Sequence, residues 1–281
     1  MRAAALSILS AVSLLFGSVV ASDGGASDDC QAVDASTVAN TGEPVGEEVV
    51  HNNITIYISR PDMESARAKS RAGTAVLYLT DVFGIALPEN KLLVDSFARA
   101  GYLTVAPDLF SGAPAPGDIN VPGFNTSEFL ARHSPSATDP IIATTIEYLR
   151  TELGVSRIGA PGYCFGGRYA FRFVAEGNGV DVAYAAHPSM LQESEIQEIG
   201  GPVSVAAAEA DALLSPAQRA ELEALLADTS EPYQVSLYSG TQHGFAVRAN
   251  LSNPVQKFAK EEAFLQAVRW FDHFLLAEQS D

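Results

Sequence analysis

A glycine-flanked turn between a strand and a helix constrains this chain most: residues 162–167 read Gly-Tyr-Cys-Phe-Gly-Gly. The apolar-rich run 155–160 before the turn is typical of a strand, and residues 168–175 after it are typical of a helix. The residue at the apex of such a unit adopts strained backbone angles, and glycines two positions before and after it leave the necessary room. Cys164 stands at this apex. We expect it to face a substrate, with the dipole of the following helix behind it and the backbone N–H of Phe165 aimed at a developing oxyanion.

Cys164 is predicted to be a nucleophile, because a helix N-terminus lowers the pKa of a thiol and the thiolate is the reactive form. The alternative is that Cys164 is a small buried hydrophobic side chain and that the glycines only serve a tight turn. The position of other polar residues along the chain decides between these interpretations.

Strands and helices alternate from residue 73 to the end of the chain, which predicts a mostly parallel sheet with helices on both faces. Two strand-like runs separated by Asn52-Asn53 are expected to form a hairpin ahead of this unit. Residues 61–72 and 107–138 are expected to be loops, and the second is long enough to cover a pocket. The expected strands are 48–51, 54–58, 74–80, 102–106, 155–160, 181–186, 203–208 and 233–238, and the expected helices are 89–100, 139–153, 168–175, 215–227 and 255–277.

Ligands of such a sheet bind in the loops at the carboxyl ends of the strands. Asp211 follows the expected strand 203–208, and His243 follows the expected strand 233–238. Nucleophile, acid and histidine in this order match the chain order of an α/β-hydrolase triad. His243 is predicted to take the proton of Cys164 and return it to a leaving group, while Asp211 holds the imidazole in the required tautomer.

Each triad partner also has a purely structural interpretation. Asp211 lies where it would cap the helix near residue 215, and a single loop histidine is often a surface group. His187, which also follows an expected strand, is the competing base. The order of the three residues, each at the end of a strand, favours the catalytic interpretation.

With these residues identified, the chain resembles the dienelactone hydrolase family, especially its secreted fungal-type members. The resemblance is carried by residues 81–84 (Asp-Val-Phe-Gly), by the turn at 162–167, by 208–211 (Ala-Glu-Ala-Asp) and by 243–248 (His-Gly-Phe-Ala-Val-Arg), within a likeness that covers about residues 45–277. The resemblance implies an α/β-hydrolase fold and a hydrolase that needs no cofactor or metal. It also implies that the substrate acylates Cys164 and that the amides of Val82 and Phe165 form the oxyanion hole.

The resemblance gives roles to two charged residues. In the family, a glutamate just before the Val82 position holds the resting thiol, and Asp81, one methylene shorter, stands there in this chain. Asp81 is therefore a candidate thiol-orienting residue, with a loop cap as the alternative. Bacterial relatives hold a substrate carboxylate with arginines. Arg248 resembles one of these arginines, although it lies one residue further from His243 than the arginine does in the bacterial pattern. Arg248 is a candidate substrate-binding residue, with a surface role as the alternative, and no second such arginine can be placed.

The composition argues against a polyanionic partner. Lys and Arg total 17 and Asp and Glu total 34, which gives a formal net charge of −17. A nucleic acid or an anionic membrane surface would require clustered Lys and Arg, and no basic stripe is present. The expected partner of the chain is its small-molecule substrate. The chain itself is expected to be a monomer or a homodimer.

The amino-terminal residues predict export. Arg2, the apolar run 3–20 and Ala21 are typical of a signal peptide (residues 1–21) that is cleaved after Ala21, with an uncleaved membrane anchor as the alternative. Residues 22–46 are polar and are expected to form a flexible lead-in. Residues 47–281 are expected to form a single α/β-hydrolase domain.

Two further features fit an extracellular protein. Asn53, Asn125 and Asn250 stand in Asn-x-Ser/Thr sequences and are candidate glycosylation sites. The two cysteines are Cys30 and Cys164, and a disulfide between them is not expected, because one lies in the lead-in and the other at the turn. Cys30 is then free or paired between chains.

These motifs predict a secreted hydrolase that acts on an ester or lactone of a small molecule through Cys164, Asp211 and His243. The alternative is a secreted protein of the same fold that binds a small ligand without turnover. Asp81 in place of the glutamate, and the ease with which thiols oxidise outside the cell, are the reasons for keeping that alternative.

Overall fold

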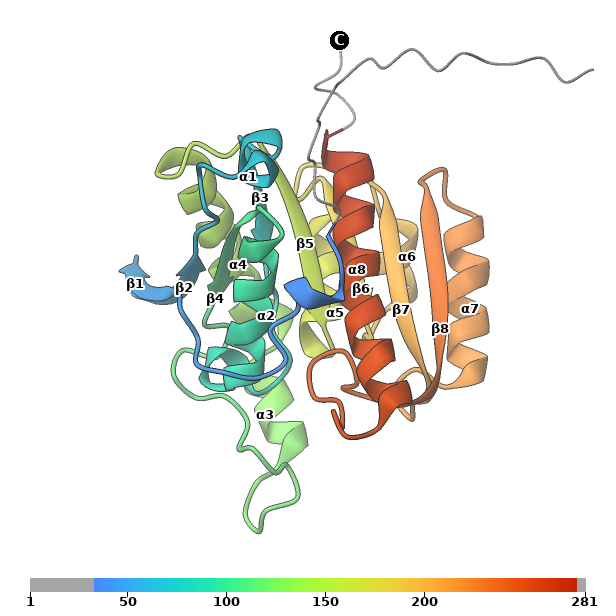
Figure 1. Ribbon diagram of the computed structural model, residues 1–281. Coiled ribbons are helices and arrows are strands. Elements are labelled where there is room, and N and C mark those ends of the chain that lie inside the picture. The colour runs from blue at the N-terminus through green and yellow to red at the C-terminus, as the bar shows by residue number, and fades with distance from the viewer. Residues whose placement is uncertain (1–32, 277–281) are drawn as a thin grey trace, which may run out of the picture.

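The sheet of this protein has eight strands, and all but one of them run in the same direction (Figure 1). The computed structural model describes residues 33–276. The strands are β1 (Glu47–His51), β2 (Ile54–Ser59), β3 (Thr74–Leu77), β4 (Leu103–Pro107), β5 (Arg157–Tyr163), β6 (Val182–Ala186), β7 (Val203–Ala210) and β8 (Tyr233–Gln242). Their order is β1-β2-β4-β3-β5-β6-β7-β8, with antiparallel pairs only at β1–β2 and β2–β4. The predicted α/β-hydrolase class with a mostly parallel sheet is confirmed.

The helices form a layer on each face of the sheet (Figure 1). Alternation along β3 explains why both faces are buried: Ala75 and Leu77 belong to the core on one face of the sheet, whereas Val76 between them belongs to the core on the other face. A strand buried on both faces reads as a continuous apolar run, which is how β3 appears in the sequence. The helices are α1 (Ala66–Ser70), α2 (Pro88–Arg99), α3 (Thr126–Arg132), α4 (Pro135–Thr151), α5 (Phe165–Phe173), α6 (Glu193–Gln197), α7 (Pro216–Ala227) and α8 (Pro254–Leu276), with short 3-10 turns η1 (Ala35–Thr37) and η2 (Gly84–Ala86).

Two short helices, α1 and α3, lie where loops were expected, and α6 lies in a segment for which no element was predicted; side-chain caps account for all three. Ser65 caps α1, and the Asn125 side chain accepts hydrogen bonds from two amides of the first turn of α3. A reciprocal pair between Gln192 and Glu195 begins α6. In addition, α4 begins at Pro135 rather than at 139, with a proline at its first position, where the missing N–H costs nothing, and Pro140 lies inside the helix.

The described part of the amino-terminal lead-in packs on the domain. Thr37, Val38 and Ala39 are buried, and the Ala39 amide donates to the Ser96 hydroxyl of α2 over 2.8 Å. Residues 33–46 therefore differ from the flexible segment that was expected for 22–46. The predicted signal peptide at 1–21 and Cys30 lie outside the described residues. No helix within 33–276 has the length and apolar character needed to cross a bilayer.

Gly166, in the first turn of α5, lets that turn approach the loop after β3. Its amide donates to the Thr80 carbonyl over 3.0 Å, and a Cβ at this position would lie 2.5 Å from the Leu79 carbonyl carbon and closer still to its oxygen. We therefore expect Gly166→Ala to lower the free energy of unfolding by about 1–3 kcal/mol, the usual effect of overpacking. Urea unfolding checks this value.

Gly117→Ala is the matched control, because Gly117 is exposed and an added Cβ there meets no atom within 4 Å. Its effect should stay within about 0.5 kcal/mol, as for most surface substitutions. Equal free energies of unfolding for the two variants would contradict the close approach at Gly166.

Candidate active site

Cys164 connects β5 to α5 in a backbone conformation that only a tightly held turn sustains. Its φ is 52° and its ψ is −110°, a region that costs a side-chain-bearing residue about 1–3 kcal/mol. Three backbone hydrogen bonds of 3.1 Å hold it there: its amide donates to Ala186, and its carbonyl accepts from Gly167 and Ser189. Cys164 is buried and carries a free thiol. The turn therefore has the geometry that the glycine spacing predicts.

The structure brings the three predicted triad residues together in one chain of hydrogen bonds. His243 Nε2 lies 3.0 Å from Cys164 Sγ. His243 Nδ1 lies 2.9 Å from Asp211 Oδ2 and 3.0 Å from Asp211 Oδ1. The residues come from the carboxyl ends of β5, β7 and β8, as expected for a parallel sheet.

Asp211 is both a loop cap and a partner of the imidazole. Its Oδ1 accepts from the amides of Leu213 and Leu214 at 2.8 and 3.2 Å, and its side chain is fully shielded from solvent. Burial works to raise the pKa of this carboxyl, but the hydrogen bond from His243 and the two amides lower it below its usual value. Asp211 therefore makes both kinds of contact that the sequence suggests: it caps a loop, and it binds the imidazole of His243.

The surroundings of His243 favour the charged form of its imidazole. Burial works to lower its pKa, but the hydrogen bonds with Asp211 and Cys164 outweigh burial and raise the pKa to about 10. An imidazolium 3.0 Å from a sulfur stabilises the thiolate form of that sulfur. The imidazolium of His243 therefore lies next to Cys164 Sγ, the atom that would attack a substrate.

His187, the competing base, does not contact the thiol. Its ring is fully buried and packs edge-on against His243, with ring centroids 5.0 Å apart. Neither ring nitrogen of His187 has a hydrogen-bond partner within residues 33–276, and burial holds its pKa well below the usual value. His187 is therefore a buried, neutral side chain that packs against the imidazole that reaches Cys164.

The two amides predicted to form the oxyanion hole have no acceptor within the described residues. Val82 and Cys164 line the same cavity, and Phe165 follows Cys164 at the start of α5. Across the described part of the chain, the amides of Val82 and Phe165 donate to no protein atom. Free amides at a helix N-terminus beside a nucleophile are the donors that an oxyanion requires.

Asp81 is turned away from the thiol. Its Oδ1 accepts from the Phe83 amide at 3.1 Å and from Asn90 Nδ2 at 2.8 Å, whereas the second neighbour of Cys164 Sγ is Ser189 Oγ at 3.8 Å. Burial raises the pKa of Asp81. In this conformation Asp81 holds the loop that carries the Val82 amide, and no hydrogen bond joins it to Cys164.

Arg248 belongs to the cavity wall and has partners within the protein. Its guanidinium lies 4.2 Å above the Phe83 ring, and its Nε is 3.8 Å from Asp81 Oδ2. It lines the same cavity as Cys164 and His243. The Asp81 carboxylate partly neutralises the charge of Arg248. Asp81 Oδ2 accepts no hydrogen bond from any described residue.

The cavity over the thiol is small and mostly apolar, with a volume of about 180 Å³. The sequence indicated only that the segment 107–138 would lie near it. The wall residues from the loops after β6 and β7 carry no motif, so sequence reasoning missed them. Its lining consists of Val82, Phe83, Ala115, Ile119, Phe124, Thr126, Phe129, Leu130, Cys164, Ser189, Met190, Leu213, His243 and Arg248.

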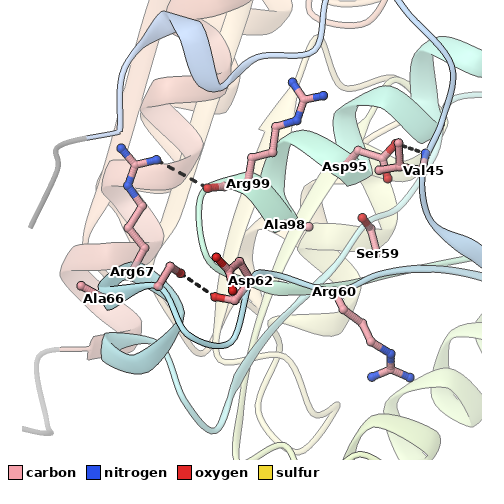
Figure 2. Close-up of a pocket in the computed structure, with 10 residues that line it drawn as sticks. Val45, Ser59, Arg60, Asp62, Ala66, Arg67, Asp95, Ala98 and Arg99 are labelled. Atoms are coloured by element: carbon pink, nitrogen blue, oxygen red, sulfur yellow. Dashed lines mark hydrogen bonds between the residues drawn. The ribbon is translucent and has the colours of Figure 1, made fainter.

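A larger hollow of about 380 Å³ lies at the opposite edge of the sheet, between β2, α1 and the end of α2 (Figure 2). There the Asp95 carboxylate accepts from the Val45 amide, and Arg67 donates to the Arg99 carbonyl. Its lining residues include neither a cysteine nor a histidine. This hollow therefore lacks the pair of a thiol and an imidazole that lines the cavity at Cys164.

The remaining predicted site residues lie on the surface. Asn53, Asn125 and Asn250 are exposed, so each is accessible to a glycosyltransferase. Within residues 33–276, no group of three or more His, Cys, Asp or Glu side chains is placed to hold a metal ion.

Comparisons with known proteins identify the family of the chain. The model of the dienelactone hydrolase family matches residues 63–275. Hydrolase pyvD of Aspergillus violaceofuscus is 42% identical over 234 residues (83% of this chain and 92% of that protein), and hydrolase tropI of Talaromyces stipitatus is 36% identical over 245 residues (84% and 93%). The dienelactone hydrolase of Anabaena variabilis shares the fold with a TM-score of 0.57 at 14% identity, over 82% of this chain and 97% of that chain. The chain belongs to the dienelactone hydrolase family.

Proposed function

We propose that this protein hydrolyses uncharged esters or lactones of small molecules through an acyl-enzyme on Cys164. The observation that carries the proposal is the 3.0 Å contact between Cys164 Sγ and the imidazole that Asp211 orients. Relatives named hydrolase and dienelactone hydrolase support the reaction class.

In the first step, the Cys164 thiolate attacks the carbonyl carbon, and the carbonyl electron pair moves to the oxygen. The amides of Val82 and Phe165, which have no other acceptor among the described residues, stabilise this oxyanion. As the tetrahedral intermediate collapses, the carbon–oxygen bond to the alcohol breaks, and His243 Nε2 gives its proton to the departing oxygen. The products are a thioester on Cys164 and a free alcohol, or one opened chain in the case of a lactone.

In the second step, a water molecule hydrolyses the thioester. His243, now neutral, takes one proton from the water while the water oxygen attacks the thioester carbon. Collapse of this second intermediate breaks the carbon–sulfur bond, releases the carboxylic acid and restores the thiolate beside the imidazolium. Asp211 holds the ring through both steps and stabilises its charged form.

The cavity favours an uncharged, apolar acyl portion. Phe83, Phe124 and Phe129 contribute most of its aromatic surface. The only arginine in the lining is Arg248, whose charge faces Asp81. A substrate carboxylate would have to compete with Asp81 for that cation and would be repelled by the strongly negative protein.

Export of the protein is part of the same proposal. The signal peptide at 1–21 and the exposed asparagines at 53, 125 and 250 support a secreted, glycosylated hydrolase. The amino-terminal sequence of the mature protein, expected to begin at Ser22, tests the cleavage.

Acyl-enzyme formation is the direct test of the mechanism. Phenyl acetate mixed with the enzyme and quenched with acid within the first turnover should leave an acetyl group on Cys164, detectable by mass spectrometry of the peptides. A ligand-binding protein without turnover would instead bind the ester stoichiometrically, remain unacylated and resist labelling of Cys164 by iodoacetamide at neutral pH. That outcome would replace the proposed hydrolase with the binding alternative.

A further inference from the structure

A second cavity shares a wall with the cavity over the thiol. It has a volume of about 150 Å³ and lies between α6, α7 and the loops after β6 and β7. Met190 and Leu213 line both cavities. The two spaces are therefore neighbours on either side of these two side chains.

The shared wall combines a fixed backbone with a flexible side chain. The Leu213 amide donates to Asp211 Oδ1 over 2.8 Å, so its backbone is tied to the triad, whereas half of the Leu213 residue is exposed (50%). Met190 adopts a left-handed conformation with φ of 58° and presents an unbranched thioether chain with three rotatable bonds. A rotamer change at Met190 is therefore the simplest way to connect the two cavities.

The strand order places the second cavity on a defined side of Cys164. Cys164 follows β5, and on one side of β5 lie β3 and β4, whose following loops carry Phe83 and residues 115–124. On the other side lie β6, β7 and β8, whose loops carry Met190, Leu213 and His243. The second cavity is thus on the same side of the nucleophile as the imidazole.

The two arms of an ester bound at Cys164 must extend in different directions from the carbonyl carbon. His243 Nε2 has to deliver its proton to the oxygen of the departing alcohol, so the alcohol arm lies on the side of His243. The acyl arm is then left with the phenylalanine-lined side. This assignment rests on the proposed function, because it uses the direction of proton transfer in that reaction.

We propose that the second cavity binds the alcohol portion of the substrate, and that this portion is an uncharged alkyl or aryl group. Ile196, Leu222 and Leu225 supply apolar surface for it. Its other lining residues include Glu193 and Glu221 but no lysine or arginine, so an anionic group would be repelled. The substrate is accordingly an ester with two apolar arms, one on each side of Cys164.

Two series of esters test the assignment. The alcohol series is methyl, butyl and octyl benzoate, and the acyl series is methyl acetate, methyl butanoate and methyl octanoate. Leu225→Trp should fill the second cavity and lower the octyl-to-methyl ratio of kcat/KM in the alcohol series at least about tenfold, since even one methylene in an apolar pocket alters selectivity by that order. The corresponding ratio in the acyl series should change less than about twofold. Ala224→Trp, on the exposed face of the same helix, is the matched control and should alter neither ratio.

Met190→Ala tests the same cavity in the opposite direction. Removal of the shared wall should raise the octyl-to-methyl ratio of the alcohol series several-fold, and this variant carries the test alone if circular dichroism shows that Leu225→Trp does not fold. An active wild-type enzyme whose alcohol-series ratio is unchanged in both variants, or whose acyl series changes instead, overturns the inference and leaves the proposed function intact. A wild-type rate no higher than that of Cys164→Ala on every ester overturns the proposed function and this inference with it.

Discussion

Replacement of Cys164 by alanine is expected to lower kcat/KM for phenyl acetate by about 10⁴-fold or more. Removal of one triad nucleophile costs about as much as removal of the whole triad, because the members act as a unit. In this protein the unit is continuous, since Sγ lies 3.0 Å from His243 Nε2 and Nδ1 lies 2.9 Å from Asp211. The rate of phenol release, followed by absorbance, measures the loss.

The fold of the Cys164→Ala variant should survive the change. Alanine keeps the Cβ, and the three backbone hydrogen bonds of the turn do not use the thiol. Circular dichroism and the thermal midpoint therefore serve as controls for folding. Cys164→Ser is the second control, because a hydroxyl keeps an oxygen near His243 but is a weaker nucleophile at neutral pH. A variant without sulfur that retains more than about one hundredth of the wild-type rate would show that another group attacks.

The turn at Cys164 was predictable because its signal is local. Gly162 and Gly166 are required where their own backbones approach neighbouring chain, and a Cβ on Gly162 would lie 2.5 Å from the Gly166 carbonyl carbon. Such steric requirements leave a fixed spacing in the sequence. The partners Asp211 and His243 were predictable for a topological reason, since parallel strands bring their carboxyl ends to one edge of the sheet.

The environment of Asp81 could not be predicted, because it depends on residues that carry no motif. Asn90, in the first turn of α2, donates to Asp81 over 2.8 Å, and the Arg248 guanidinium approaches from the loop after β8. These contacts hold the Asp81 carboxylate next to Asn90 and Arg248. Ser189, rather than Asp81, is the second polar neighbour of the thiol. Packing between distant segments of the chain decides which of several nearby groups a side chain contacts.

The cavity walls were beyond prediction for a related reason. Phe124 and Phe129 come from a segment expected to be a loop, and their placement depends on α3, which Asn125 caps. Met190 and Leu213 become walls only because α6 and α7 pack side by side. Apolar residues in loops have no period that assigns them to a face. The reaction class therefore follows from the sequence much more directly than the shape of the substrate.

Asp211→Asn is expected to lower kcat/KM by about 10⁴-fold while the backbone of the site stays in place. An asparagine amide that donates to His243 Nδ1 would fix the tautomer with the proton on Nε2, so the neutral ring could not accept a proton from the thiol. The carboxylate also supplies part of what raises the pKa of His243 to about 10. The variant therefore loses both the orientation of the ring and the stabilisation of its charged form.

The pH dependence separates this effect from simple misfolding. The pKa of His243 is raised from 6.5 to about 10, so its contribution to stability is fully present below pH 6.5 and is lost as the pH rises through about 10. For an alkyl ester, which needs a protonated imidazole to release the alcohol, wild-type kcat/KM should persist to about pH 10 and fall above it. In Asp211→Asn the falling limb should move to lower pH, together with the alkaline loss of thermal stability.

Asp228→Asn provides the matched control, since it removes the same charge from an exposed position at the end of α7. Its alkaline limb should coincide with that of the wild type, because net charge alone acts weakly over long distances in salt. Measurements of kcat/KM on methyl benzoate from pH 5 to 11 and of the thermal midpoint over the same range decide the matter. If the limbs of Asp211→Asn and the wild type coincide, the carboxylate does not set the charge of His243, and the thiolate–imidazolium pair must be maintained by Cys164 and the helix dipole of α5 alone.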